Sequence, residues 1–229
     1  MIERRSHTAS HTAPRQSGAK PVAINRWMQH IHPHIETAHM ESMRALLAAV
    51  DAKDRYTRSH SLNVAAYAVE IGRRLRLPEP ALETLEVAAL LHDLGKIGVA
   101  DAILNKPGPL TDEEYDAVKK HPQTAVDILG HMSFLNDHRP IILHHHERFD
   151  GSGYPTGRSG EEIPIGARIL AVADALDTML SPRTYKEAFT TDRVRRELRH
   201  GAGRQFDPAI VNLTLRWLDE HPPRGGKMM

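Results

Sequence analysis

Apolar residues recur at helical spacing along most of this chain. The clearest stripe lies between Ile35 and Val50, where one helix face carries Met40, Met43, Leu46, Leu47 and Val50. Such a stripe is typical of a helix packed into a core or of the seam of a homodimer. Residues 81–91 show the same period, and no segment shows the alternation of a half-buried β-strand. We therefore predict an all-α fold.

Capping residues and prolines mark the ends of further helices. Ser59, Thr111 and Asp207 are candidate caps, because their side-chain oxygens can accept hydrogen bonds from the free N–H groups at a helix start. Thr111 opens a capping box, Pro208 fits the first turn of the last helix, and Pro78 ends the helix that starts at Ser59. The helices expected beyond the first stripe span residues 59–77, 81–91, 111–121, 139–146, 166–180 and 207–220.

The amino-acid composition leaves the prediction of an all-α fold unchanged but excludes several classes of protein. The 229 residues carry 30 basic and 29 acidic side chains, a formal charge of +1 that argues against DNA binding. No cysteine is present, which excludes disulfides and zinc–thiolate sites. No run approaches the ~20 apolar residues of a membrane-spanning helix, and the N-terminus lacks the apolar segment of a secretory signal. A soluble cytoplasmic enzyme is therefore expected.

The domain organisation follows from the same patterns. Residues 1–34 are rich in Ser, Thr, Ala and His and have no apolar period, so they are expected to form a disordered tail. Residues 35–222 are expected to form one folded domain with a mostly aliphatic core, since only 5% of the chain is aromatic. Residues 223–229 are expected to be a short C-terminal tail.

The most informative segment for chemistry is His144-His145-His146-Glu147, which runs on to Gly153-Tyr154-Pro155. Neighbouring histidines are poor core residues, because each buried ring nitrogen needs a hydrogen-bond partner. They are good ligands for Fe, Mn, Ni, Cu or Zn. The glycines and the proline let the backbone approach a bound ligand closely. The alternative is a surface histidine run beside a flexible loop.

A second candidate lies at the end of the helix over residues 81–91. His92 and Asp93 are expected in its last turn, with Gly95 as the helix terminator. Two consecutive helical side chains diverge by about 100° around the axis. They therefore suit a pair of metals bridged by the carboxylate better than one compact site. The alternative is a surface Asp93 with His92 interacting with the helix dipole.

In their order along the chain, these segments resemble the HD-GYP family, a subset of HD-superfamily phosphohydrolases that hydrolyse cyclic dinucleotides. The resemblance covers about residues 51–212. Its most specific blocks are His-Asp-Leu-Gly-Lys at 92–96 and the stretch from His145 to Pro155. The other blocks lie at 53–61, 103–108, 121–122, 162–170, 174–177, 183–186 and 205–208. The resemblance implies an HD-superfamily helical bundle behind a disordered N-terminal tail.

The side chains that could ligate metal are His60, His92, Asp93, His121, His145, His146 and Asp174, and the family pattern carries over to each. By that resemblance Asp93 bridges two ions. His60, His92 and Asp174 complete the shell of one ion, and His121, His145 and His146 that of the other. Five imidazoles and two carboxylates suit Fe or Mn better than Mg. Relatives with a third metal carry a glutamate where this chain has Tyr56, so two divalent transition-metal ions are expected.

The resemblance also implies a catalytic set around these ions. Two cations about 3.5–4 Å apart lower the pKa of a bridging water and hold the phosphate oxygens. Lys96 is expected to neutralise charge that builds on the phosphoryl group. Asp54 and Asp177 are candidates for orienting ligands or the attacking water, with helix capping or solvation as the alternative. His144 is expected to support the neighbouring ligands or to pack a helix.

Substrate recognition is expected from the loop and from the residues that follow the Asp174 helix. Tyr154, flanked by Gly153 and Pro155, offers a ring that can stack on a guanine. Arg183 and Lys186, three residues apart, could hold a phosphate or a guanine edge. In the alternative interpretation, Tyr154 and Pro155 only shape the loop. Asn63 stands where the family commonly has arginine, and only local packing is expected to change.

Two functions from different classes follow. The leading hypothesis is a metal-dependent phosphodiesterase that hydrolyses cyclic di-GMP to linear pGpG and on to GMP through a metal-bridging hydroxide. The competing hypothesis is a signalling module whose loop docks a partner such as a GGDEF-type cyclase with little catalysis. Degenerate relatives of the second kind lack ligands, whereas this chain has the full set, which favours the enzyme.

Overall fold

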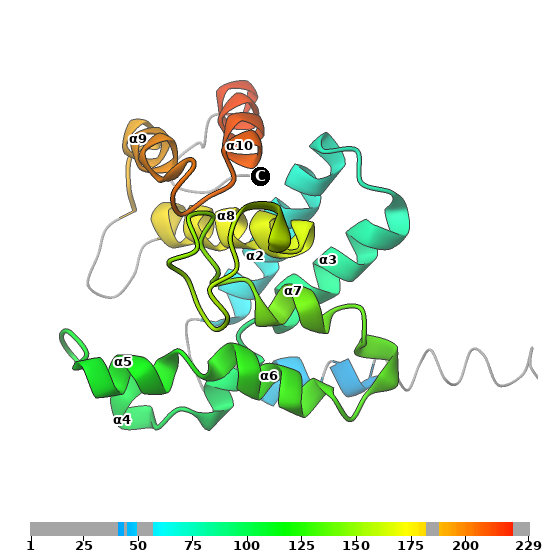
Figure 1. Cartoon of the computed structure of the whole chain (residues 1–229), viewed down its shortest axis with the longest axis vertical. Helices are drawn as coiled ribbons and strands as arrows, with labels where there is room; N and C mark the ends of the chain where they lie inside the picture. Colours follow the sequence, from blue (N-terminus) through cyan, green and yellow to red (C-terminus); the bar gives the residue numbers. More distant parts are fainter. Residues whose placement is uncertain (1–40, 44, 50–56, 182–187, 222–229) are drawn as a thin grey trace, which may run out of the picture. The chain divides into compact units, whose positions relative to one another are not determined.

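The computed structural model describes residues 41–43, 45–49, 57–181 and 188–221 of the chain. The described residues from Met43 onward belong to one compact unit, and everything described below lies in it. Its described residues form helices and no β-strand, so the prediction of an all-α fold is confirmed. The elements, labelled in Figure 1, are α2 (Thr57–Arg74), α3 (Glu79–Leu91), η1 (Leu94–Gly98), α4 (Asp101–Leu104), α5 (Asp112–Val118), α6 (His121–Leu129), η2 (Ser133–Leu135), α7 (Arg139–Leu143), η3 (Gly160–Glu162), α8 (Ile165–Leu180), α9 (Thr191–Gly201) and α10 (Pro208–Glu220).

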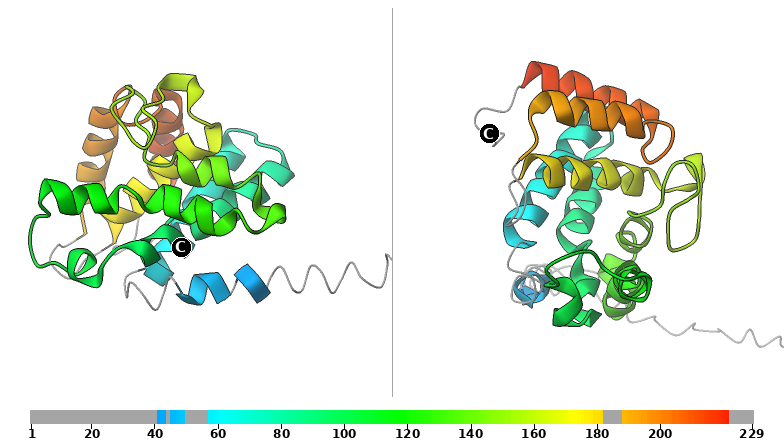
Figure 2. Two further views of the ribbon diagram at one scale, coloured as in Figure 1. Left: turned by 60° about the horizontal axis from the view of Figure 1, so that its bottom comes forward. Right: turned by 90° about the vertical axis from the view of Figure 1, so that its left-hand side faces the viewer.

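The larger core is built by α2, α3, α8, α9 and α10. Helix α8 packs against α2, and α9 and α10 lie side by side against α8 (Figures 1 and 2). Each helix contributes aliphatic side chains that are almost fully buried, among them Ile71, Leu85, Leu170, Leu176, Leu198 and Leu218. Burying one such side chain stabilises a fold by roughly 1.5–3 kcal/mol. The core is therefore mostly aliphatic, as the composition predicts.

A smaller core joins the end of α3 to η1, α6, η2 and α7. Its buried members are Ala88, Leu91, Leu94, Ala125, Leu129, Leu135 and Ile142. Met43, Leu46 and Leu47, from the stripe predicted between residues 35 and 50, pack against this cluster. Of the two interpretations of that stripe, core packing is thus observed for its three described members. Helix α3 contributes to both cores, so its C-terminal end lies where the two meet.

The caps at Thr111 and Asp207 are confirmed, whereas the one at Ser59 is wrong. Thr111 accepts from the N–H of Glu114, whose carboxylate accepts in return from the N–H of Thr111. Helix α2 already begins at Thr57, so Ser59 lies inside it. The same helix ends at Arg74, before the expected Leu77, because Arg76 adopts a left-handed φ of 59° and the N–H of Leu77 donates to the carbonyl of Gly72.

Three other helix boundaries differ from the predicted ones, and each difference changes the position of candidate ligands relative to a helix end. His92 and Asp93 follow α3 instead of closing it, and His121 begins α6 instead of ending the preceding helix. The histidine cluster follows α7, which stops at Leu143. Sequence periodicity cannot distinguish a residue in a last helical turn from one just beyond it.

Several predicted features lie outside the described residues. These are the tails at 1–34 and 223–229, together with Asp54, Arg183 and Lys186. Helix α9 was not predicted, although Thr190 caps it by accepting from the N–H of Arg193. Within the described part of the chain, no helix combines the length and apolarity needed to cross a membrane.

Candidate metal centre

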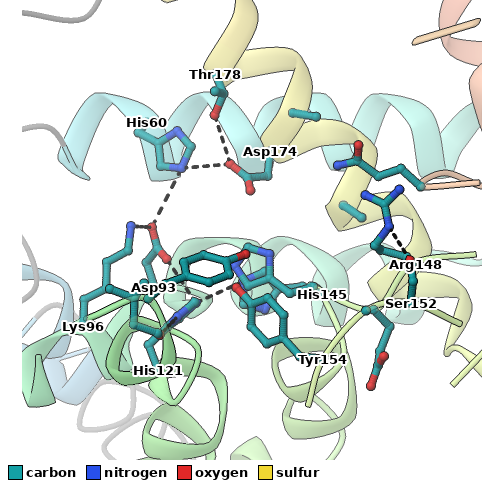
Figure 3. A pocket seen from close by; sticks show the side chains of 18 residues that line it. His60, Asp93, Lys96, His121, His145, Arg148, Ser152, Tyr154, Asp174 and Thr178 are labelled. Carbon is teal, nitrogen blue, oxygen red and sulfur yellow. Dashed lines mark hydrogen bonds and ion pairs between the residues drawn. The ribbon is translucent and has the colours of Figure 1, made fainter. Parts of the chain in front are cut away.

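The candidate ligands converge where the two cores meet. His60 comes from α2 and Asp174 from α8, both elements of the larger core. His121 begins α6, and His145 and His146 follow α7, both elements of the smaller core. His92 and Asp93 directly follow α3, the helix that the two cores share. Figure 3 shows His60 and Asp174 facing Asp93, His121 and His145 across a cavity.

Three of the histidines are oriented by the end of the helix that precedes each of them. The Nδ1 atoms of His92, His121 and His145 lie 2.6, 2.8 and 2.6 Å from the carbonyl oxygens of Ala89, Val118 and Ile142. The last carbonyls of a helix have no partner within it, so each imidazole satisfies one of them. A carbonyl can only accept, so each Nδ1 must carry the proton. The Nε2 lone pair is then left for the cavity, as a metal ligand requires.

The candidate donor atoms form two clusters that share no member. One contains His60, His92 and Asp174, and the other His121, His145 and His146, each with its donor atoms within 4.8 Å of one another. A third group with the same spacing, His92, Asp93 and His145, overlaps both clusters. In the first cluster, His60 Nε2 lies 3.3 Å from Asp174 Oδ1. In the second, the Nε2 atoms of His121 and His145 are 3.4 Å apart. Metal bonds of about 2.0–2.2 Å place neighbouring donors about 3–3.5 Å apart, so both clusters fit a transition-metal ion.

The carboxylate of Asp93 lies between the two clusters. Its Oδ2 is 3.4 Å from His92 Nε2 and 3.9 Å from His60 Nε2, on the side of the first cluster. Its Oδ1 is 3.6 Å from His121 Nε2, on the side of the second. One oxygen therefore faces each cluster, the arrangement in which a carboxylate can be shared by two ions.

The protonation states of the second cluster suit metal binding. Burial lowers the pKa of His121, lowers that of His146 to about 4, and holds the pKa of His145 well below its usual value. Neighbouring histidines lower these pKa values further. All three rings are therefore neutral at pH 7, and a neutral imidazole is the form that binds a metal.

The first cluster carries more negative charge. Burial alone would lower the pKa of His60, but hydrogen bonds to Asp174 and Asp177 outweigh it and raise that pKa to about 9. Burial would raise the pKa of Asp93, but the charges of Lys96, His92 and His121 hold it well below the usual range. A cation entering this cluster would displace a proton from His60 while finding two ionised carboxylates, which favours a divalent ion.

Asp177 orients the imidazole of His60 through a hydrogen bond to Nδ1, the ring nitrogen other than the candidate ligand atom. It is fully buried on α8, and its Oδ2 accepts from His60 Nδ1 at 2.7 Å. Its Oδ1 accepts from Asn63 Nδ2 at 2.8 Å and from Ser181 Oγ at 3.0 Å. Asn63 is thus part of the network that orients a candidate ligand, a role that the sequence analysis missed. Its partner lies 114 residues away in the chain, and no local pattern indicates such a contact.

Glu147 fixes the loop that carries Gly153, Tyr154 and Pro155. Its buried carboxylate accepts from the N–H of Thr156 at 2.7 Å, from the hydroxyl of Thr156 at 2.7 Å and from the N–H of Gly157 at 3.1 Å. His144 packs against this group, with Nδ1 3.6 Å from Glu147 Oε1. The loop is therefore held against the residues that follow α7, and His144 contacts it away from the ligand clusters.

Gly153 and Tyr154 serve the loop in different ways. A Cβ on Gly153 would lie 2.3 Å from the backbone nitrogen of Arg148, so only glycine fits there. The ring of Tyr154 lies over His146, with centroids 4.9 Å apart. Burial raises the pKa of Tyr154, so its hydroxyl keeps its proton and can donate a hydrogen bond.

The donors open onto a cavity of about 550 Å³. Lys96 lies at one side, with Nζ 2.6 Å from Asp93 Oδ2. Arg148 lies at the other side, beyond Tyr154 (Figure 3). Tyr115, an exposed aromatic residue of α5, also lines the cavity and was not singled out from the sequence. Cavities of about 300–1,000 Å³ are typical of small-molecule sites.

Comparison with known proteins identifies the domain family. Residues 36–210 match the family model described as HD domain. The cyclic di-GMP phosphodiesterase response regulator RpfG of Xanthomonas campestris pv. campestris is 41% identical over 184 residues, which are 80% of this chain and 49% of that protein. Cyclic di-GMP phosphodiesterase PA4108 of Pseudomonas aeruginosa is 36% identical over 231 residues, 93% of this chain and 55% of that protein. This chain thus spans about half the length of these relatives.

Two solved structures have the same fold. A cyclic GMP-AMP-specific phosphodiesterase of Vibrio cholerae, V-cGAP3, superimposes with a TM-score of 0.59 at 22% identity, covering 80% of this chain and 49% of that one. The HD domain of the Listeria monocytogenes phosphodiesterase PgpH superimposes with a TM-score of 0.54 at 18% identity, covering 76% of this chain and 97% of that domain. Both likenesses concern the helical fold.

Proposed function

The chain belongs to the HD-GYP family of HD domain proteins, and on that premise we propose that it is a metal-dependent phosphodiesterase that hydrolyses cyclic di-GMP. The proposal rests on the position of Asp93, because its two carboxylate oxygens face two separate clusters of candidate ligands. Relatives named as cyclic di-GMP phosphodiesterases support the choice of substrate. Others are named as 3'3'-cGAMP-specific, so cyclic dinucleotides are the substrate class to test.

In this proposal the ligand sets divide as the clusters do. His60, His92 and Asp174 would hold one divalent ion, His121, His145 and His146 would hold another, and Asp93 could serve both. Iron or manganese suits this mixture of imidazole and carboxylate. When bound, such a pair supplies Lewis-acid stabilisation of phosphate oxygens and a nucleophilic water at neutral pH.

The chain's own residues contribute positioning and charge. Water adds to the phosphorus, the bond to the ribose 3' oxygen breaks, and that oxygen takes up a proton, which leaves linear pGpG and, after a second cleavage, GMP. Lys96 lines the cavity beside Asp93, where its ammonium would offset charge on the phosphoryl oxygens. Asp177 keeps the Nε2 of His60 directed at the cavity. Tyr154, with Gly153 and Pro155 shaping its loop, offers a ring to a guanine.

One experiment tests this function. Anaerobically purified protein should contain about two iron or manganese ions per chain. It should convert cyclic di-GMP to pGpG, separated by chromatography, and lose this activity when a chelator removes the metal. Activity should return with Fe²⁺ or Mn²⁺ but not with Mg²⁺, which prefers all-oxygen sites. Full activity without metal would contradict the mechanism. Tight binding of a GGDEF-type cyclase without turnover would favour the docking alternative.

A second prediction concerns Arg183 and Lys186, which lie outside the described residues. If both hold the anionic substrate, the double change to Ala should remove charge-assisted hydrogen bonds and raise KM for cyclic di-GMP well over tenfold. KM of the parent should rise with salt, and the double variant should show a flatter dependence. Arg196 and Arg199, two exposed α9 arginines at the same spacing, provide the matched control when both are changed to Ala.

The two interpretations of this pair differ in what else changes. Loss of metal and a lower melting temperature together with activity would indicate that Arg183 and Lys186 stabilise the fold. A folded, metal-loaded double variant with the parent's KM would exclude them from substrate binding.

A further inference from the structure

A second cavity adjoins the one that contains the ligand clusters. Its volume is about 390 Å³, and the two cavities share Arg148, Ala175, Thr178 and Gln205 in their walls. The far side of the second cavity is formed by α9 and by the turn that joins α9 to α10. A ligand larger than the first cavity would therefore extend into the second one past Arg148.

The shared wall is fixed by backbone hydrogen bonds. The N–H of Phe149 donates to the carbonyl of Gln205, and the N–H of Asp150 donates to the carbonyl of Arg204 at 2.8 Å. Arg148 Nε donates to Ser152 Oγ at 2.8 Å. These contacts join the loop after the histidine cluster to the turn before α10. The two cavities therefore keep a defined position relative to each other.

The side chains of the second cavity combine three kinds of chemistry. Arg204 and His200 are exposed and offer hydrogen-bond donors. Glu197, also exposed, is the one acidic side chain among the described residues that line this cavity, and its Oε1 lies 3.7 Å from Arg193 Nε. Phe189 adds an aromatic ring, over which the guanidinium of Arg193 lies 3.6 Å from the centroid. Donors, one acceptor and an aromatic ring are what a nucleotide with a polar base edge needs.

We propose that the second cavity binds the distal nucleotide of the cyclic dinucleotide, with Arg204 and Glu197 determining specificity. The inference rests on the proposed function, because the substrate contains two nucleotides and only one phosphodiester can lie at the ligand clusters at a time. The other nucleotide must occupy neighbouring space, and the adjoining cavity provides it. Glu197 suits guanine there, because guanine presents adjacent N1–H and N2–H donors to a carboxylate and adenine does not. Arg204 suits the guanine O6 and N7 acceptors or the second phosphate.

The test compares two substrates in the metal-loaded full chain. Bis(p-nitrophenyl) phosphate contains one phosphodiester and no second nucleotide, whereas cyclic di-GMP would fill both cavities. Arg204→Ala should raise KM for cyclic di-GMP at least about tenfold, because a charge-assisted hydrogen bond is lost. Arg204 lines only the second cavity, so hydrolysis of bis(p-nitrophenyl) phosphate should stay at the wild-type rate. Arg196→Ala, which removes an exposed arginine of the neighbouring helix α9 that lines neither cavity, is the matched control.

Glu197→Gln separates base recognition from general electrostatic attraction. Removing a negative charge near an anionic substrate would lower KM for every cyclic dinucleotide if only charge mattered. If Glu197 accepts from guanine, KM for cyclic di-GMP should instead rise about tenfold, while KM for cyclic di-AMP stays the same or falls. The two interpretations of Glu197 therefore predict opposite changes in KM for cyclic di-GMP.

The outcomes distinguish failure of the proposed function from failure of the second nucleotide site alone. Absence of cyclic di-GMP hydrolysis in the metal-loaded wild-type enzyme would overturn the proposed function and this site with it. Hydrolysis by the wild type, with unchanged KM for cyclic di-GMP in Arg204→Ala or a lowered KM in Glu197→Gln, would overturn the second site alone.

Discussion

An Asp93→Ala variant should lose at least about a thousandfold in the rate of cyclic di-GMP hydrolysis, equivalent to about 4 kcal/mol in the barrier. In the part of the chain that the structure describes, Asp93 is the carboxylate whose oxygens face both ligand clusters, so its removal affects both at once. It also removes the partner of Lys96, 2.6 Å away, and so changes the charge beside the scissile phosphate. Metal content should fall below about one ion per chain, measured by elemental analysis alongside the rate.

Asp127→Ala is the matched control for this prediction. Asp127 is an exposed carboxylate on α6 that accepts from Gln123 and lies outside the cavity. It should keep the parent's metal content and rate, and circular dichroism should show that both variants fold. An Asp93→Ala protein that retained two ions and most of its activity would contradict a shared carboxylate.

The largest effect on stability is expected at Gly95, within η1. A Cβ at this position would lie 1.8 Å from the carbonyl oxygen of His121 and 2.6 Å from the backbone nitrogen of Ala125. Backbone atoms cannot rotate away, so Gly95→Ala must push η1 and α6 apart. We expect the free energy of unfolding to fall by about 3 kcal/mol, the upper range for overpacking. A shift of the urea midpoint at unchanged slope would measure it.

Gly98→Ala provides the comparison within the same short helix. The nearest atom to a Cβ there is Thr124 Cγ2 at 3.2 Å, a side-chain atom that can move. This change should cost less than about 1 kcal/mol. Because His121 begins the helix that Gly95 contacts, Gly95→Ala should also lower metal occupancy. Equal unfolding midpoints for the two variants would show that the close approach of η1 and α6 is not required.

Local sequence patterns predicted the helices of this chain but not the contacts between distant segments. Periodicity and caps sufficed to predict helices such as α8 and α10 and the all-α class, because they depend on neighbouring residues. Six of the seven predicted ligands line one cavity, and His92 lies in a cluster with two of them, yet their spacing in the chain could not show that they face one another. Gly95 was interpreted as a helix terminator, whereas in the structure it allows the backbone of α6 to approach η1. That contact depends on packing, which no single segment contains.

The supporting residues were the hardest to predict. Asn63 and Asp177 meet across 114 residues, and Glu147 contacts Thr156 and Gly157 through a loop whose path the sequence does not fix. Ser59 was interpreted as a cap because its residue type is favourable at a helix start, but α2 already includes it. Residue type alone therefore could not decide where α2 begins.

The hydrogen bonds that orient the histidines imply an order of assembly. His92, His121 and His145 each donate to a carbonyl three residues earlier, so their rings can be aimed as soon as the preceding helix forms. His60 depends on Asp177, 117 residues away, and is aimed only when α8 docks on α2. Contacts of long sequence separation form late in folding, because the entropy of closing a long loop must be overcome first. The cluster of His60, His92 and Asp174 should therefore form last during folding. Separation of α8 from α2 would disrupt this cluster before the one formed by His121, His145 and His146.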